Sequence, residues 1–282
     1  MKFIRLATIA ALSSTILAGG AVSAFAEEAR EVTTDGQIQF TAPTDEDGEL
    51  EVIPPLDPED EDTPDVDINP EVPGTTGPLS IMKAATMNFG SQVISNQDMT
   101  YNMVAEMQQL AGTTGDDNKV PYVSFAQVQD LRGTNAGWDL QVSLSDFESA
   151  TQNNILTGAQ IALVDSRIQY EGSNQTNAPE AHANGLTLIP NGAARSIMTA
   201  AEGKGAGASS VVWGNQADLN AQFENEDIEV VENNAIQLSI PGATAKDATT
   251  YKSTLTWELT TTPDEDGPET DGPEEDGPEA DA

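Results

Sequence analysis

The sequence contains no cysteine, a single histidine, and 11 lysine and arginine residues against 47 aspartate and glutamate residues. The absence of cysteine excludes disulfide bonds, thiolate metal ligands and cysteine nucleophiles. A single histidine leaves no second imidazole for a histidine metal site. The stability of the protein must therefore come from the burial of a hydrophobic core, so we expect a sizeable folded part.

Positive charge is scarce, and the formal net charge at pH 7 is −36. Thirteen acidic residues lie between Asp45 and Glu71 and ten lie between Asp264 and Asp281, with no lysine or arginine in either stretch. Residues 77–262 hold 20 acidic and 8 basic residues, a more mixed composition. Binding to phosphate backbones and anionic lipids requires the opposite sign, so the charge excludes a nucleic-acid-binding role.

Long apolar runs are absent except at the N-terminus. Lys2 and Arg5 precede the apolar residues 6–17, and Ala24-Phe25-Ala26 has the small-x-small pattern of a signal peptidase site. This pattern predicts a signal peptide over residues 1–26; a retained anchor is disfavoured because the stretch is short. No later segment approaches the ~20 apolar residues of a membrane span. We expect a secreted chain that does not span the membrane after cleavage.

Two acidic segments flank the remaining sequence. Residues 27–76 are rich in proline, aspartate and glutamate, and residues 263–282 repeat an acidic unit that ends in Asp-Gly-Pro. Such compositions bury too little apolar surface to offset the entropy of ordering, so both are predicted to be disordered, the first as a spacer and the second as a tail. The tail lacks the spacing of an EF-hand loop, and we predict no metal site and no cofactor.

Residues 77–262 are predicted to form a single all-β domain. Apolar residues alternate with polar ones at Leu140–Leu144, Leu186–Leu188, Ile236–Ile240 and Tyr251–Leu259, and turn signals containing glycine, asparagine and proline separate these runs. Many short strands of this kind indicate a β-sandwich or a barrel-like domain. Residues 99–110 fit either a strand or a helix turn, and the small residues of Gly203–Ser210 are predicted to form a flexible loop.

Two Trp-x-Leu elements stand out in a chain with three tryptophans: Trp138 with Leu140, and Trp257 with Leu259. Residues two apart in a strand share a face, so each element places an indole beside an aliphatic side chain. One interpretation is that both pairs fill the core, where tryptophan contributes a large apolar area. The other is a platform for sugar rings, which stack on exposed indoles. The pattern favours the core.

These elements lie in two longer runs that resemble the signatures of the WxL domain family. Residues 128–142 (VQDLRGTNAGWDLQV) resemble the first signature, and residues 251–259 (YKSTLTWEL) resemble the second. The resemblance covers residues 77–262 and implies a protein of the Gram-positive cell surface that attaches non-covalently to peptidoglycan. It also implies assembly with WxL-interacting and sortase-anchored surface proteins. The acidic tail after the second signature departs from the family pattern.

Asp130 and Arg132, inside the first signature, fall on one face of a predicted strand. Two roles remain open for them: a local ion pair, or contacts to the hydroxyl, amide and carboxylate groups of peptidoglycan. Trp213 belongs to neither signature and is the better candidate for an exposed aromatic side chain.

Signals of catalysis are weak. His182 is the single histidine and lies in a predicted loop, where a histidine is usually solvated, and the Gly-x-Ser-x-Gly motif is absent. A pair of carboxylates suited to glycoside hydrolysis cannot be located from sequence. We therefore predict a non-enzymatic attachment protein. The alternatives are a structural subunit without affinity for glycan and, less favoured, a surface glycosidase.

Overall fold

The structure, a computed structural model, describes residues 37–43 and 51–261. The predicted signal peptide and acidic tail lie outside these residues. The strands and helices all belong to the unit that begins at Thr41. Fifteen strands and one short α-helix, α1 (Gln216–Phe223), are present in the described part, together with two 3-10 turns, η2 (Asp116–Asn118) and η3 (Gln175–Asn177).

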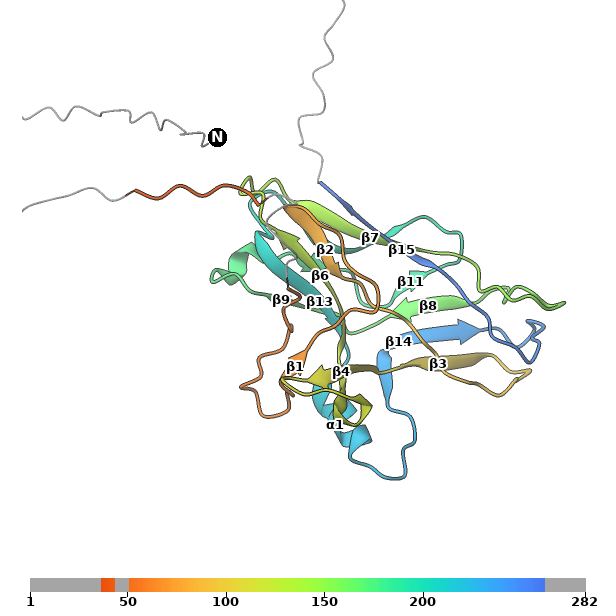
Figure 1. The fold of residues 1–282 in the computed structure, drawn as a ribbon. Helices are drawn as coiled ribbons and strands as arrows, with labels where there is room; N and C mark the ends of the chain where they lie inside the picture. Colours follow the sequence, from red (N-terminus) through yellow and green to blue (C-terminus); the bar gives the residue numbers. More distant parts are fainter. Residues whose placement is uncertain (1–36, 44–50, 262–282) are drawn as a thin grey trace, which may run out of the picture. The chain divides into compact units, whose positions relative to one another are not determined.

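The strands pair in four separate sheets, and every pairing is antiparallel (Figure 1). The first sheet has the order β1 (Val66–Asp67), β4 (Glu106–Leu110), β5 (Lys119–Tyr122). The second is β2 (Leu79–Lys83), β6 (Ser124–Asp130), β13 (Gly207–Trp213), β9 (Arg167–Tyr170). The third is β10 (Glu180–Ala181), β12 (Arg195–Ala200), β7 (Trp138–Leu144), β15 (Leu255–Thr260). The fourth is β11 (Leu186–Leu188), β8 (Gln160–Leu163), β14 (Glu232–Ile240), β3 (Met99–Val104).

The predicted all-β class is confirmed, but a single sandwich or barrel is not what the strands form. Four small sheets are arranged more like the blades of a propeller than like two facing layers. Neighbours in a sheet come mostly from distant parts of the chain, so the sheets cannot be assembled from consecutive hairpins alone. Sequence alternation reports which face of a strand is buried, and it carries no information on which strands pair.

Strand β7 illustrates why alternating residues form these elements. Its residues alternate between buried and half-buried positions along the whole strand. Trp138, Leu140, Val142 and Leu144 enter the larger hydrophobic cluster, which also receives side chains from the second and fourth sheets. The β-strand period of two places these four side chains on one face, and their burial is the main force that holds the sheets together.

The predicted spacer contributes to the fold, in contrast to expectation. Val66 forms part of β1, and Val52, Leu56 and Val66 are buried in a second hydrophobic cluster with side chains from β2, β5, β6, β13 and α1. The amide of Leu56 also donates a hydrogen bond to the Tyr122 hydroxyl at 3.2 Å. We call residues 51–76 the strap. The folded part therefore begins well before residue 77.

The chain from Gly203 to Ser210 differs in part from the prediction of a flexible loop. Residues 203–206 lie outside any strand, but Gly207 opens β13, a central strand with β6 on one side and β9 on the other, and Ala208, Ser209 and Ser210 are buried. Small side chains occur here because both faces of the strand are covered closely. The ambiguous residues 99–110 form two strands, β3 and β4.

Candidate functional site

The first Trp-x-Leu element lies in the core. The side chains of Trp138 and Leu140 are both fully buried, and Trp138 Nε1 donates a hydrogen bond to the Gly205 carbonyl oxygen at 3.1 Å. A buried indole N–H needs such an acceptor, because an unpaired one costs about 1–3 kcal/mol. Trp138 thus has its apolar surface and its single donor satisfied inside the protein, and it presents no face to a sugar.

The second element is on the adjacent strand and is less enclosed. Trp257 and Leu259 on β15 lie opposite Val142 and Leu140 on β7, so the two signatures pair with each other. Both side chains are half-buried and pack against the larger cluster. Strand β15 ends its sheet, and its outer edge pairs with no other described strand. The two Trp-x-Leu elements therefore differ in accessibility.

Asp130 and Arg132 form an ion pair with each other. Arg132 Nε and Nη2 donate to the two carboxylate oxygens of Asp130 at 2.9 and 2.8 Å, and Nη2 also reaches the Gly137 carbonyl at 2.8 Å. Hydrogen bonding to Asp130 raises the pKa of Arg132. Asp130 is almost fully buried. The pair closes the turn that leads into the Trp138 strand. Of the two roles left open by the sequence, the structure shows the local ion pair.

Trp213 is not the exposed aromatic side chain that the sequence favoured. It is fully buried at the end of β13, and its Nε1 donates to His182 Nε2 at 2.9 Å. The two rings stack with centroids 6.0 Å apart. His182 Nδ1 lies 2.8 Å from the Ala183 carbonyl oxygen, so the neutral ring donates there and accepts from Trp213. Burial lowers the pKa of His182 and favours this neutral state.

A cleft of about 370 Å³ opens where the third and fourth sheets meet. Its walls come from strands β3, β7, β8, β14 and β15 and from the loops beside them, which Figure 1 places at one end of these strands. We call it the apolar cleft. Its apolar lining consists of Met87, Phe89, Val93, Ile94, Tyr101, Leu144, Phe147, Leu156, Ile161, Leu238, Ile240, Tyr251 and Leu255.

The cleft combines this apolar lining with a few polar groups. Tyr251 is held by two hydrogen bonds, donating to the Asn153 carbonyl at 2.6 Å and accepting from the Asp247 amide at 3.0 Å. The Asp247 carboxylate accepts from the Asn153 backbone and side chain, and these bonds keep its pKa below the usual range. Lys246 Nζ is held by three backbone carbonyls. Lys252 is exposed and forms no ion pair among the described residues.

This arrangement is typical of a ligand site. Protein clefts that hold small ligands are mostly apolar, with a small number of fixed polar groups that orient the ligand. Val93 and Ile94, at the cleft, are 88% and 53% exposed, which leaves apolar surface available to a ligand. The second signature supplies part of the lining, since Tyr251, Lys252 and Leu255 precede Trp257 in the chain.

Most residues of this site carry no signal in the sequence. Phe89, Val93 and Ile94 show no strand periodicity, and the cleft unites them with residues more than a hundred positions away. The one feature of the sequence that could have indicated the site is that Val93 and Ile94 are apolar but belong to no alternating run. Of the predicted site residues Trp138, Leu140, Trp257, Leu259, Asp130 and Arg132, none lines the cleft.

The described residues contain no group of three or more histidine, cysteine or acidic side chains that could hold a metal ion. None of the helices within the described ranges is long and apolar enough to cross a membrane.

The described residues form an all-β domain with an open, ligand-sized cleft. Comparison with known families shows what kind of domain this is: residues 27–263 match the WxL family, described as a surface cell wall-binding domain, and the chain belongs to this family. No curated protein and no solved structure matches the chain. The protein is thus a cell-surface protein with a cell wall-binding domain.

Proposed function

We propose that the protein is exported by a signal peptide to the surface of a Gram-positive cell and attaches non-covalently to peptidoglycan through the apolar cleft. The cleft is the observation that carries this proposal. It is the feature of the described structure that offers accessible apolar surface, aromatic rings and an unpaired ammonium group together.

The chemistry of the cleft suits peptidoglycan. The apolar faces and acetyl methyl groups of the glycan match the aromatic and aliphatic lining, where contact area gives affinity. The carboxylates of the stem peptides match Lys252, whose charge no described acidic side chain neutralises. General attraction to an anionic wall is excluded by the net charge of −36, so recognition has to come from contacts of this kind.

We also propose that the protein is not an enzyme. Among the described residues that line the cleft, Asp247 is the single carboxylate, and glycoside hydrolysis uses two. The hydrogen bonds that lower the pKa of Asp247 also make it a poor proton donor. His182 has both ring nitrogens engaged with Trp213 and Ala183, which leaves no nitrogen for proton transfer to a substrate.

A second candidate function is assembly with partner proteins. Strand β15 exposes an edge without a described partner, and Leu255, Trp257 and Leu259 are half-buried along it. Such an edge can accept a strand from another protein. We propose WxL-interacting and sortase-anchored surface proteins as the partners, in a multi-protein surface complex. In the extreme form of this alternative the protein is a structural subunit without affinity for glycan.

Co-sedimentation with purified peptidoglycan, stripped of proteins and teichoic acids, tests the proposal. We expect the wild-type protein to sediment with the wall and Val93→Asp to remain mostly in the supernatant, because a carboxylate in the cleft opposes apolar contact. Val72→Asp is the matched control, since Val72 is 71% exposed and lies outside the cleft. It adds the same charge and should leave retention unchanged.

The outcomes separate the two candidate functions. Retention of wild-type protein and of both variants would mean that the wall is bound elsewhere on the surface. A folded wild-type protein that stays in the supernatant would contradict direct attachment and favour the structural subunit. Release of soluble sugar fragments during the incubation would contradict the non-enzymatic proposal.

A further inference from the structure

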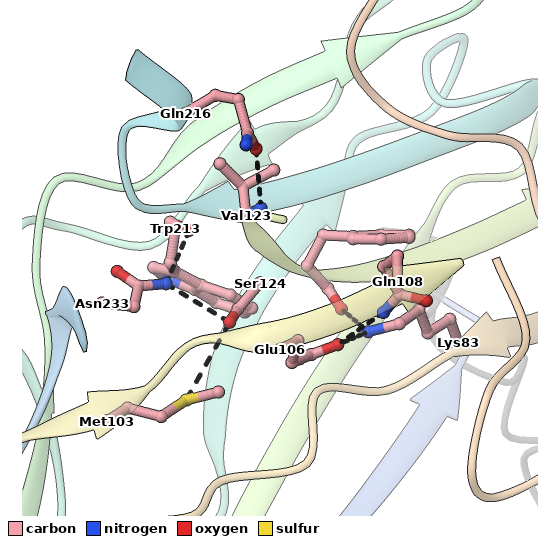
Figure 2. Close-up of polar contacts among 10 residues, drawn as sticks. Lys83, Met103, Glu106, Gln108, Val123, Ser124, Trp213, Gln216 and Asn233 are labelled. Carbon is pink, nitrogen blue, oxygen red and sulfur yellow. Dashed lines mark hydrogen bonds and ion pairs between the residues drawn. The ribbon is translucent and has the colours of Figure 1, made fainter. Parts of the chain in front are cut away.

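The second hydrophobic cluster encloses an unexpected pair of charged side chains, Lys83 at the end of β2 and Glu106 at the start of β4. Their exposed fractions are 3% and 13%, and Lys83 Nζ lies 2.7 Å from Glu106 Oε2 (Figure 2). Lys83 Nζ also donates to the Phe125 carbonyl at 3.3 Å and lies 4.3 Å from the centroid of the Phe125 ring. Phe125 is fully buried, so the pair is shielded from water.

A carboxamide completes the group. Gln108 lies two residues after Glu106, on the same face of β4, and is also buried. Its Nε2 is 3.4 Å from Glu106 Oε2, the same oxygen that contacts Lys83 (Figure 2). A primary amine and a carboxamide therefore meet on one carboxylate oxygen, away from solvent. Glu106 Oε1 is buried without a hydrogen-bond partner.

This environment disfavours the ionised form of the pair. Removing two charges from water is costly, and the attraction between the two charges repays this cost only in part. Burial raises the pKa of Glu106 in spite of the lowering by Lys83 and by the Ser124 side chain. Transfer of a proton from the Lys83 ammonium to Glu106 gives a neutral amine, which is a nucleophile, beside a neutral carboxylic acid, which is a proton donor.

We propose that Lys83 and Gln108 become joined by an intramolecular isopeptide bond, with Glu106 as the general acid and base. The neutral Lys83 amine attacks Cδ of Gln108, and the protonated Glu106 donates its proton to the departing amide nitrogen as the C–N bond breaks. The Glu106 carboxylate formed in this way then takes the surplus proton from Nζ. One Nζ–Cδ bond forms, one ammonia molecule leaves, and no oxidant or other reactant is needed.

The position of Glu106 suits both proton transfers, because its Oε2 contacts the attacking nitrogen and the leaving nitrogen. Holding the reactants in this geometry replaces an encounter in solution with an intramolecular step. The bond would connect β2 of the second sheet with β4 of the first. It would give this cysteine-free chain the kind of covalent closure that disulfides give other extracellular domains.

Intact-mass measurement of the full chain, after denaturation, tests the proposal independently of wall binding. We expect a mass below that of the sequence by one ammonia molecule, and a digest in which the peptides of Lys83 and Gln108 are linked. Lys83→Arg, Gln108→Met and Glu106→Ala should restore the unmodified mass of each variant, because each removes the amine, the acyl carbon or the general acid. Gln109→Met is the matched control on the same strand, and it should retain the loss of ammonia.

Circular dichroism establishes that each protein compared is folded. A folded wild-type protein with the full sequence mass would overturn the proposal and leave Lys83 and Glu106 as a buried ion pair. Loss of one water molecule in place of ammonia would indicate an amide between Lys83 and Glu106 and overturn the role of Gln108. Loss of ammonia that persists in Lys83→Arg would place the modification elsewhere and also overturn it.

Discussion

Gly205 supports the buried Trp138 in two ways. Its carbonyl accepts the indole hydrogen bond, and its backbone has a φ of +72°, which residues other than glycine rarely adopt. A Cβ at this position would lie 2.5 Å from Ala200 Cβ and 2.7 Å from Trp138 Nε1. The close approach of the Gly205 backbone is therefore a condition for the burial of the first signature tryptophan.

We expect Gly205→Ala to lower the free energy of unfolding by about 2–4 kcal/mol, because backbone strain and overpacking add at this site. Gly203→Ala is the control, since Gly203 also has a positive φ, of +80°, but nothing lies within 4 Å of its Cβ position. It should cost only about 1 kcal/mol, from strain alone. Urea denaturation measures both values, and equal losses would argue against the contact with Trp138.

The His182–Trp213 contact predicts a pH dependence of stability. The pKa of His182 in the folded protein is lowered by burial, so the unfolded chain takes up a proton more readily. Stability therefore falls as the pH drops through the unfolded-state value of about 6.5, and the fall ends below the folded-state pKa. Protonation would also place an N–H of His182 against the N–H of Trp213.

Thermal unfolding of the wild-type protein and of His182→Gln at pH 7.5 and pH 5.5 tests this effect. Glutamine can accept the Trp213 hydrogen bond and does not titrate. We expect the wild-type protein to lose more stability than the variant on acidification. Comparison of the two removes the contribution of Glu106, whose raised pKa acts in the opposite direction. The same loss in both proteins would exclude His182 as the cause.

At the scale of elements, the strap is the segment whose role is easiest to test. Val52, Leu56 and Val66 are buried, and β1 pairs with β4 at the edge of the first sheet. We expect residues 51–261 to unfold cooperatively in urea and residues 77–261 to be less stable by several kcal/mol, since each lost core side chain is worth about 1.5–3 kcal/mol. Equal midpoints and slopes for the two fragments would show that the strap is dispensable.

Elements with clear alternation could be predicted from the sequence, and others could not. Strands β7 and β14 and the end of the second signature show a local period of two, which side-chain burial on one face imposes. Strand β13 shows no such contrast, because it is covered on both faces by close neighbours and carries small residues. The role of the strap could not be predicted, because its composition is acidic and its few apolar residues are too widely spaced to form a pattern.

The candidate site was predictable only in part for a related reason. The signature residues marked the correct strands, β7 and β15, but Trp138 serves the core and Asp130 pairs with Arg132. The cleft depends on residues such as Phe89, Phe147 and Tyr251, which are brought together by pairing between distant strands. No local pattern encodes that pairing.

At the scale of the whole molecule, charge governs how the protein approaches an anionic wall. The net charge of −36 opposes approach over a distance set by the Debye length, about 10 Å at 0.1 M salt. We therefore expect retention on peptidoglycan that still carries its anionic polymers to increase as sodium chloride is raised. Retention should also increase as the pH falls toward about 4, where carboxylates are neutralised.

Co-sedimentation across salt and pH series measures this effect, with circular dichroism at each pH to confirm that the protein remains folded. Peptidoglycan stripped of its anionic polymers is the control, and it should show a weaker dependence on salt. Binding that weakens steadily with added salt would point to attraction between opposite charges as the main force, contrary to the proposal.

The position of β15 also has a consequence for the order of events during folding. Leu255–Thr260 is the last strand in the described part of the chain, yet it pairs with residues 139–144 of β7, which come from the middle of the sequence. Until this strand is available, one edge of β7 stays open and its apolar face is incompletely covered. Folding by such long-range pairing is slow compared with local structure formation. A protein built this way completes its third sheet only after residues 255–260 have been made, more than a hundred residues after the strand with which they pair.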